Sequence, residues 1–172
     1  MILCAFFAAL TSVSSQIAIP LPFSPVPISA ASIFAIGSGI IQGPFTGILS
    51  QLVFLLIGAA GMPVFSRMQG GFSVLIGPTG GYLLAYPISS LVAGFIVKRK
   101  KDSVLFCFLG YLSGTLICYL FGTLWFMASA NTNLYTAVLQ CVLPFLVTDC
   151  VKIILGSIFC KKINAHLELV SL

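Results

Sequence analysis

The sequence predicts an all-α integral membrane protein, folded as one compact bundle of six transmembrane helices. Hydrophobic residues make up 59% of the 172 residues and charged residues only 6%, whereas soluble domains carry about 25% charged residues. Such a chain cannot cover itself with a water-facing surface. At about 20 residues per span, its apolar stretches allow five or six helices. We expect a single transmembrane domain, 1–172, with spans at about 2–16, 29–41, 45–60, 77–97, 104–128 and 135–160.

The first expected span carries Ala5 and Ala9 four residues apart on one helical face. Small side chains at this spacing allow another helix to approach closely within a membrane. That helix belongs either to this chain or to a separate membrane subunit, and the residues alone favour packing within the chain.

The segment 19–28 has four prolines within eight residues, Pro20, Pro22, Pro25 and Pro27. This density forbids a helix and predicts an extended, polyproline-like path. Irregular backbone is tolerated at the membrane interface or around a water-filled cavity, not against lipid. The segment is therefore either a stiff connector or a preformed wall over a binding site.

Two helices, 29–41 and 45–60, are expected to meet in a tight turn at Gly43-Pro44. A mere kink at Pro44 would instead leave five spans and move the N-terminus to the other side of the membrane. Small residues at every fourth position suit close helix packing. They form two rows: Ala31, Ala35, Gly39, Gly43 and Gly47, then Gly110, Gly114, Cys118 and Gly122.

The connection 61–76 is long for a compact domain, and such loops are usually functional. The block Gly77-Pro78-Thr79-Gly80-Gly81-Tyr82 follows it. Proline suits the first turn of a helix, and the free N–H groups of that turn can receive an acceptor oxygen. Gly80 allows a ligand or another backbone to come within contact distance.

Asp149 and Lys152 are the only charged residues in the last apolar stretch, 135–160. Three residues apart, they share one face of a helix, and Pro144 is expected to kink that helix before them. An ionisable side chain within the hydrocarbon region costs roughly 2.5–3.5 kcal/mol. The pair is therefore either a structural ion pair or part of a site for a polar ligand, and the two explanations start with equal weight.

Other features argue against an enzyme, a metal site or a nucleic-acid partner. The glycine block lacks the lysine of a P-loop. His166, the single histidine, lies in the polar tail, and the six cysteines form no C-x-x-C pair and are expected to be free. The bases cluster at expected membrane boundaries, 98–101 and 161–162, and only Arg67 lies on the other side. This distribution predicts that both termini are cytoplasmic and that the proline-rich and 61–76 loops face outside.

Three blocks of the chain resemble the BioY family. The segment 15–28 is similar to the first loop of that family, 61–83 to its third loop and fourth helix, and 143–152 to its last helix. BioY proteins are the biotin-binding membrane subunits, or S components, of energy-coupling factor (ECF) transporters. The resemblance implies capture of biotin from outside a prokaryotic cell. It also implies, as partners in the plasma membrane, an ECF energising transmembrane subunit and two ABC-type ATPases. Ala5 and Ala9 would dock on the energising subunit.

With biotin as the transported substrate and no cofactor, the candidate residues take separate roles. Asp149 is suited to accept from the ureido N–H groups, and Lys152 to donate to the ureido carbonyl or to hold Asp149 ionised. The other expected contacts are donors at a helix start (Thr79, Gly80), rings on the apolar part (Phe23, Phe72, Tyr82) and groups near the carboxylate tail (Ser15, Gln16, Arg67). The alternatives are a stand-alone carrier or channel for another small solute, and a small membrane enzyme.

Overall fold

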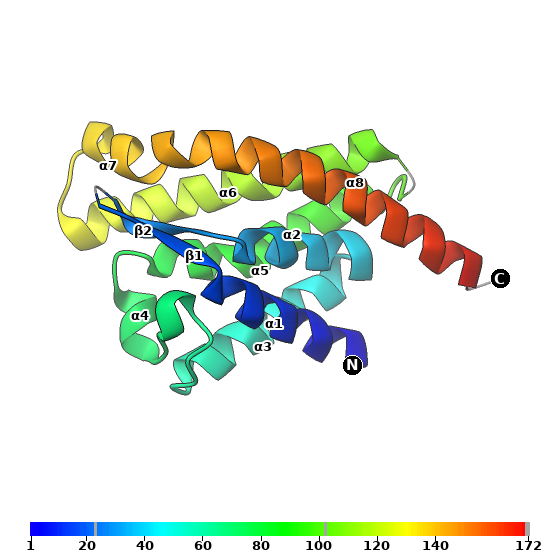
Figure 1. Cartoon of the computed structure of the whole chain (residues 1–172), viewed down its shortest axis with the longest axis horizontal. Helices are drawn as coiled ribbons and strands as arrows, with labels where there is room; N and C mark the ends of the chain where they lie inside the picture. Colours follow the sequence, from blue (N-terminus) through cyan, green and yellow to red (C-terminus); the bar gives the residue numbers. More distant parts are fainter. Residues whose placement is uncertain (23, 102, 171–172) are drawn as a thin grey trace.

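The structure is a computed structural model that describes residues 1–22, 24–101 and 103–170. These residues form mainly helices, with one pair of strands near the N-terminus (Figure 1). The elements in chain order are α1 (Ile2–Gln16), β1 (Ala18–Leu21), β2 (Ser24–Ser29), α2 (Ala31–Gln42), α3 (Pro44–Ala59), η1 (Ser66–Met68), α4 (Phe72–Ile76), α5 (Gly80–Val97), α6 (Val104–Ala130), α7 (Leu134–Cys141), η2 (Leu143–Phe145) and α8 (Leu146–Val170).

Within the described residues, three helical stretches are long and apolar enough to cross a membrane. They are 80–97, 104–130 and 134–164, the last running through α7, η2 and α8. Helices α1, α2 and α3 are apolar but shorter. Gly43, with φ of 89°, separates α2 from α3, and Pro44 opens α3. The tight turn expected at Gly43-Pro44 is therefore present.

The proline-rich segment is extended, but it is an antiparallel hairpin rather than a lone polyproline path. Ala18 pairs with Ser29 and Ile19 with Ile28, and the register slips before Leu21 pairs with Ser24. Proline cannot donate to a strand ladder and is confined to edge strands. Both strands of a two-stranded sheet are edges, so the prolines are accommodated. The fold is thus not purely α-helical.

The helix expected at 77–97 begins later, at Gly80. The preceding residues form a turn in which the N–H of Gly80 donates to the carbonyl of Gly77 at 2.9 Å. Trp125 of α6 donates its indole N–H to the same carbonyl at 3.0 Å. Gly77 has an extended backbone, so the chain turns here before the helix can start.

The expected last span, 135–160, is not one continuous helix. Helix α7 ends at Cys141, a short η2 turn contains Pro144, and α8 then runs to Val170. Val142 leaves the helical region, with φ of −124° and ψ of −54°. Proline lacks the N–H that a helix interior needs, which explains the break. Helix α8 also continues ten residues beyond the expected end.

Helix α5 is central and packs against α2, α3 and α6. The glycines of the two rows lie at contacts between helices, except Gly43, which lies in the turn between α2 and α3. A Cβ on Gly39 would lie 1.8 Å from the Ser90 carbonyl oxygen, and one on Gly122 would lie 2.3 Å from the Tyr82 ring. The glycines therefore bring the helices closer than any side chain would allow.

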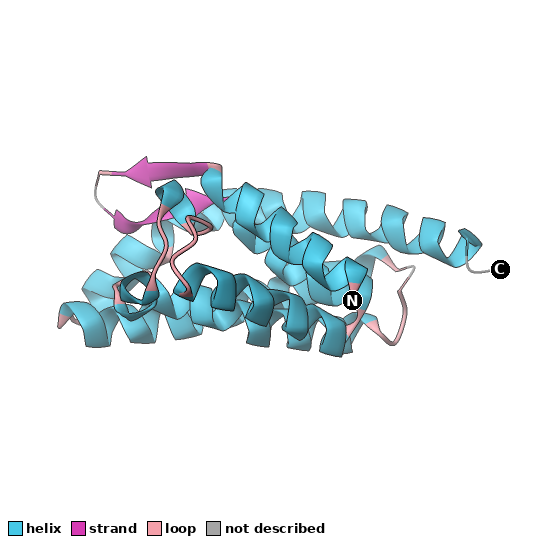
Figure 2. Ribbon diagram, turned by 90° about the horizontal axis from the view of Figure 1, so that it is seen from below, coloured by secondary structure: helices cyan, strands magenta, loops and turns pink. Residues whose placement is uncertain are grey.

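The loops separate into two groups at opposite ends of the bundle. The two termini and the basic α5–α6 connection lie at one end, and α4, α7 and the tip of the hairpin lie at the other (Figure 1). The hairpin lies on the outside of the helices at that second end (Figure 2). The polar and irregular segments singled out in the sequence therefore gather at one end of the molecule.

Candidate ligand site

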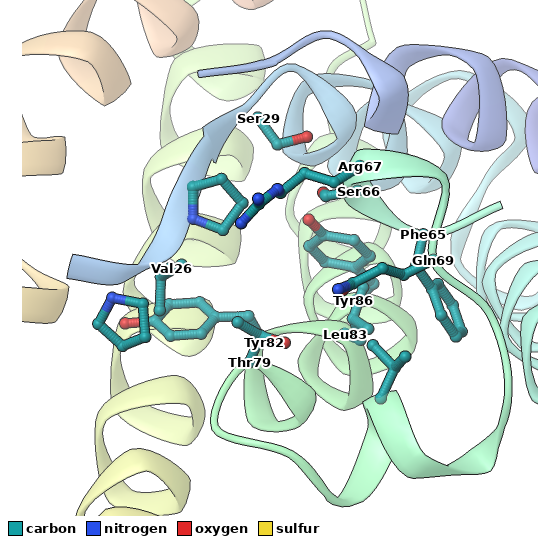
Figure 3. Close-up of a pocket in the computed structure, with 13 residues that line it drawn as sticks. Val26, Ser29, Phe65, Ser66, Arg67, Gln69, Thr79, Tyr82, Leu83 and Tyr86 are labelled. Atoms are coloured by element: carbon teal, nitrogen blue, oxygen red, sulfur yellow. The ribbon is translucent and has the colours of Figure 1, made fainter. Parts of the chain in front are cut away.

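A cavity of about 130 Å³ lies between strand β2, the loop 65–69 and helix α5 (Figure 3). Figure 3 shows the Arg67 side chain reaching from the loop toward β2. Aromatic, aliphatic and polar side chains share the walls, which suits a ligand with both apolar and polar parts. The lining includes Val26, Ser29, Arg67, Thr79, Tyr82 and Tyr86.

A second cavity, of about 70 Å³, adjoins the first and leads deeper into the bundle. The two cavities share five lining residues, Val26, Pro27, Ser29, Tyr82 and Tyr86. The deeper one is also lined by Tyr119 of α6, by Phe145 of η2 and by Asp149 and Lys152 of α8. Together they make one elongated site with Arg67 at one end and Asp149 at the other.

Asp149 and Lys152 form an ion pair at the deep end of this site. Lys152 Nζ donates to Asp149 Oδ1 at 2.8 Å, and the two side chains are only 17% and 14% exposed respectively. The hydroxyl of Tyr119 donates to Asp149 Oδ2 at 2.6 Å. Both carboxylate oxygens are therefore bound, one from the same helix and one from α6. A hydrogen bond of this length to an ionised oxygen is of the strong, charge-assisted kind.

Ser15 and Gln16, expected near the ligand tail, instead hold the loop that carries Arg67. The Gln16 amide N–H group donates to the carbonyls of Pro63 and Phe65 at 3.1 Å each, and its Oε1 accepts from the Met68 N–H at 2.9 Å. The Ser15 hydroxyl donates to the Val64 carbonyl. Through these contacts the Gln16 side chain fastens the end of α1 to the loop, and it does not line either cavity.

The loop itself is a tight structure that directs Arg67 over the site. Arg67 and Met68 both have left-handed backbone angles, with φ of 63° and 57°, which is uncommon for residues other than glycine. The Phe65 N–H closes the turn by donating to the Gln69 carbonyl at 2.9 Å. The Phe65 ring is buried edge-to-face against Phe54, with ring centroids 5.5 Å apart. The loop is thereby anchored at its base and held in one shape.

The start of α5 contributes side chains rather than free N–H groups. Thr79 and Tyr82 line the first cavity, and the Tyr82 hydroxyl donates to the Cys141 carbonyl at 2.8 Å. Gly80 does not line it. A Cβ at Gly80 would lie 1.8 Å from the Leu75 carbonyl oxygen, so this glycine is needed for the close approach of α4 to α5.

The remaining expected residues lie away from the two cavities or outside the described residues. Phe72 begins α4 with 64% of its surface exposed and lines neither cavity. Phe23 lies outside the described residues. Ala5 and Ala9 are both exposed on α1, on the face that also exposes Phe6 and Val13. Ala5 and Ala9 therefore form an exposed strip along α1 that no other described residue of this chain covers.

Two aromatic residues of the site, Tyr86 and Tyr119, were missed in the sequence. Tyr86 lies one helical turn after Tyr82 and shares its face, so it could have been found from that spacing. Tyr119 follows Cys118 in the row of small residues, and nothing local distinguishes it from the other aromatic residues of that span. In the described residues, no group of three or more His, Cys, Asp or Glu side chains could hold a metal ion.

Comparison with known proteins identifies the family. The BioY family profile matches residues 1–169. The probable biotin transporter BioY of Pyrococcus horikoshii is 38% identical over 164 residues, 95% of each chain. The biotin transporter BioY of Thermotoga maritima is 30% identical over 165 residues, again 95% of each chain. A crystal structure of the S component for biotin from an ECF-type ABC transporter superposes with a TM-score of 0.87 at 27% identity, covering 94% of this chain and 88% of that one. The chain therefore belongs to the BioY family.

Proposed function

We propose that this protein is the substrate-binding membrane subunit of a vitamin uptake transporter and captures biotin from the extracellular side. The observation that carries the proposal is the Asp149–Lys152 ion pair at the deep end of a two-part cavity. The two residues lie on one helix, so their ion pair does not join two helices, and both of them line the cavity. The relatives named as biotin transporters and the solved biotin S component support the choice of ligand.

The deep end of the site complements one edge of a ureido ring. That edge presents an N–H donor next to a carbonyl acceptor, and the protein presents a carboxylate acceptor next to an ammonium donor. Asp149 Oδ1 and Lys152 Nζ are 2.8 Å apart, so both can reach the same edge of a planar group. In this arrangement Asp149 accepts from the ureido N–H and Lys152 donates to the ureido carbonyl. Hydrogen bonds inside a protein are stronger than in water because the effective dielectric constant is lower there.

The rest of biotin follows the elongated shape of the site. The fused rings are apolar and would pack between Tyr82, Tyr86 and Val26, which line both cavities. The carboxylate tail would then point toward Arg67, which lines only the cavity farther from Asp149. A guanidinium is well suited to a carboxylate because it donates two parallel N–H groups. Thr79 offers a further hydroxyl at the same end.

The distribution of charge supports the direction of capture. The clusters 98–101 and 161–162 adjoin the end of the bundle that holds the termini, whereas Arg67 lies in η1, directly before α4, which is at the other end. Under the positive-inside rule the termini are cytoplasmic and the site opens outward. Six membrane crossings result when α1, α2, α3, α5 and α6 each cross once and α7 and α8 together cross once more.

Partner subunits would supply the ATP hydrolysis, because the glycine block of this chain lacks the lysine of a P-loop. The proposed partners are an ECF energising transmembrane subunit and two ABC-type ATPases, within the membrane lipid. The exposed strip with Ala5 and Ala9 on α1 offers a surface that another helix can approach closely.

The proposal is tested by calorimetric titration of the purified protein with biotin in detergent. We expect saturable binding of one biotin per chain. Retention of a different vitamin, with no heat from biotin, would overturn the substrate assignment. Uptake of biotin into liposomes that contain this chain without ATPases would favour the stand-alone carrier and overturn the requirement for a partner.

A further inference from the structure

We infer that Tyr119 is a positioning residue that sets the ligand specificity of the site, by fixing the Asp149 carboxylate as an acceptor for N–H donors. The inference rests on the proposed function and concerns a residue that lies on a different helix from the ion pair. It predicts that the Tyr119 hydroxyl controls discrimination between ligands that carry the N–H donor and ligands that lack it.

The two oxygens of the Asp149 carboxylate are bound by different residues on different helices. Lys152 binds Oδ1 at 2.8 Å, and Tyr119 binds Oδ2 at 2.6 Å. Lys152 and Asp149 are on the same helix, so their bond moves with α8 and cannot fix the carboxylate relative to the rest of the site. Tyr119 is on α6, so its bond ties the carboxylate to a second wall of the same cavity.

The direction of the Tyr119 bond decides what the carboxylate can do. An ionised carboxylate only accepts, and its two oxygens together offer about four acceptor positions. Two of these are taken by Lys152 and Tyr119, and the remaining ones can receive only a donor. Tyr119 therefore determines which acceptor positions of the Asp149 carboxylate remain open to a donor on the ligand.

A purely structural role for Tyr119 is less consistent with its surroundings. Another tyrosine of the same helix, Tyr111, already joins α6 to α2 and α8, because its hydroxyl donates to the Ile33 carbonyl at 3.1 Å and lies 3.2 Å from Cys160 Sγ. Tyr111 is 2% exposed and lines neither part of the elongated site. Tyr119 is less buried and lines the cavity beside Asp149. Tyr111 is thus a matched control for the loss of a tyrosine hydroxyl from this helix.

The test measures the dissociation constants of two ligands for each of four proteins. The ligands are biotin and a biotin whose ureido nitrogens are methylated. The proteins are the wild type, Tyr119→Phe, Tyr111→Phe and Asp149→Asn. A hydrogen bond to a charged group corresponds to roughly a 10- to 100-fold change in affinity. We expect the wild type to bind biotin at least about 10-fold more tightly than the methylated ligand. Tyr119→Phe should lose most of this preference for biotin. Tyr111→Phe should keep the preference but lose thermal stability.

The double variant Tyr119→Phe/Asp149→Asn makes the argument specific to the carboxylate. If Tyr119 acts through Asp149, removal of its hydroxyl has little further effect on the preference once Asp149→Asn is in place, since coupled residues are not additive. An unchanged preference in Tyr119→Phe, or full additivity in the double variant, would overturn the inference and leave biotin binding standing. A wild type that binds both ligands equally would overturn it without any variant. A wild type that binds no biotin would overturn the proposed function as well.

Discussion

Replacement of Asp149 by asparagine separates a binding role for the ion pair from a structural one. Asparagine keeps the shape, but it has one acceptor oxygen for the two donors that Asp149 now receives from Lys152 and Tyr119. At least one donor is left without its partner, and the ligand loses a charged acceptor. Hydrogen bonds to charged groups contribute about 1.5–3 kcal/mol. We therefore expect biotin to bind about 10- to 150-fold more weakly, as measured by calorimetric titration in detergent.

The stability of the variants gives the control. Asp149→Asn leaves Lys152, whose side chain is only 17% exposed, without its counter-ion, and we expect a loss of about 1–3 kcal/mol in the free energy of unfolding. The double variant Asp149→Asn/Lys152→Met removes that charge and should recover most of the stability while biotin binding stays weak. Lys162→Met, an exposed lysine on the same helix, should change neither quantity. Wild-type affinity in the double variant would show that the pair is only a structural clasp.

Three further predictions concern the tail end of the site, the loop and α1. Arg67→Gln should weaken biotin about 10-fold but leave biotin amide unaffected in the same titration, because the amide has no carboxylate to pair; equal losses would contradict a role in binding the tail. Gln16→Ala removes three hydrogen bonds to the loop and should speed tryptic cleavage after Arg67 at least about five-fold, with an unchanged rate arguing against the fastening. Ala5→Leu/Ala9→Leu should reduce co-purification with the energising subunit roughly 10-fold without changing biotin affinity, and intact assembly would exclude the α1 strip as the docking surface.

The rarity of charge made Asp149 and Lys152 predictable. In an apolar span a charged pair three residues apart has few explanations, and the structure places both residues at one cavity. Tyr119 also binds the Asp149 carboxylate, but it could not be predicted. Aromatic side chains are common in this chain, and the contact of Tyr119 with Asp149 joins residues 30 positions apart. Patterns of neighbouring residues in the sequence cannot indicate a contact between residues so far apart along the chain.

Ser15 and Gln16 show a different limit of the sequence. From the sequence, we expected both residues to lie near the carboxylate tail of the ligand. The structure supplies backbone carbonyls of the 61–76 loop instead. In the same way, four prolines exclude a helix for 19–28, but the pairing of Ala18 with Ser29 depends on where the chain turns back. Local residue types therefore predict that a partner is needed, and only the fold determines which partner is present.

The break between α7 and α8 has a consequence for the energy of the buried carboxylate. Because the chain leaves the helix at Val142 and Pro144, a new helix begins beside the cavity, and Asp149 lies in its first turn. The N-terminal end of a helix carries a partial positive charge that stabilises a nearby anion by about 0.3–1 kcal/mol, more where water is excluded. In an unbroken helix the same residue would lie mid-way along the axis, where that field is absent. Pro144 thus does more than bend the chain, because it places a positive electrostatic potential at the depth where the protein keeps a negative charge.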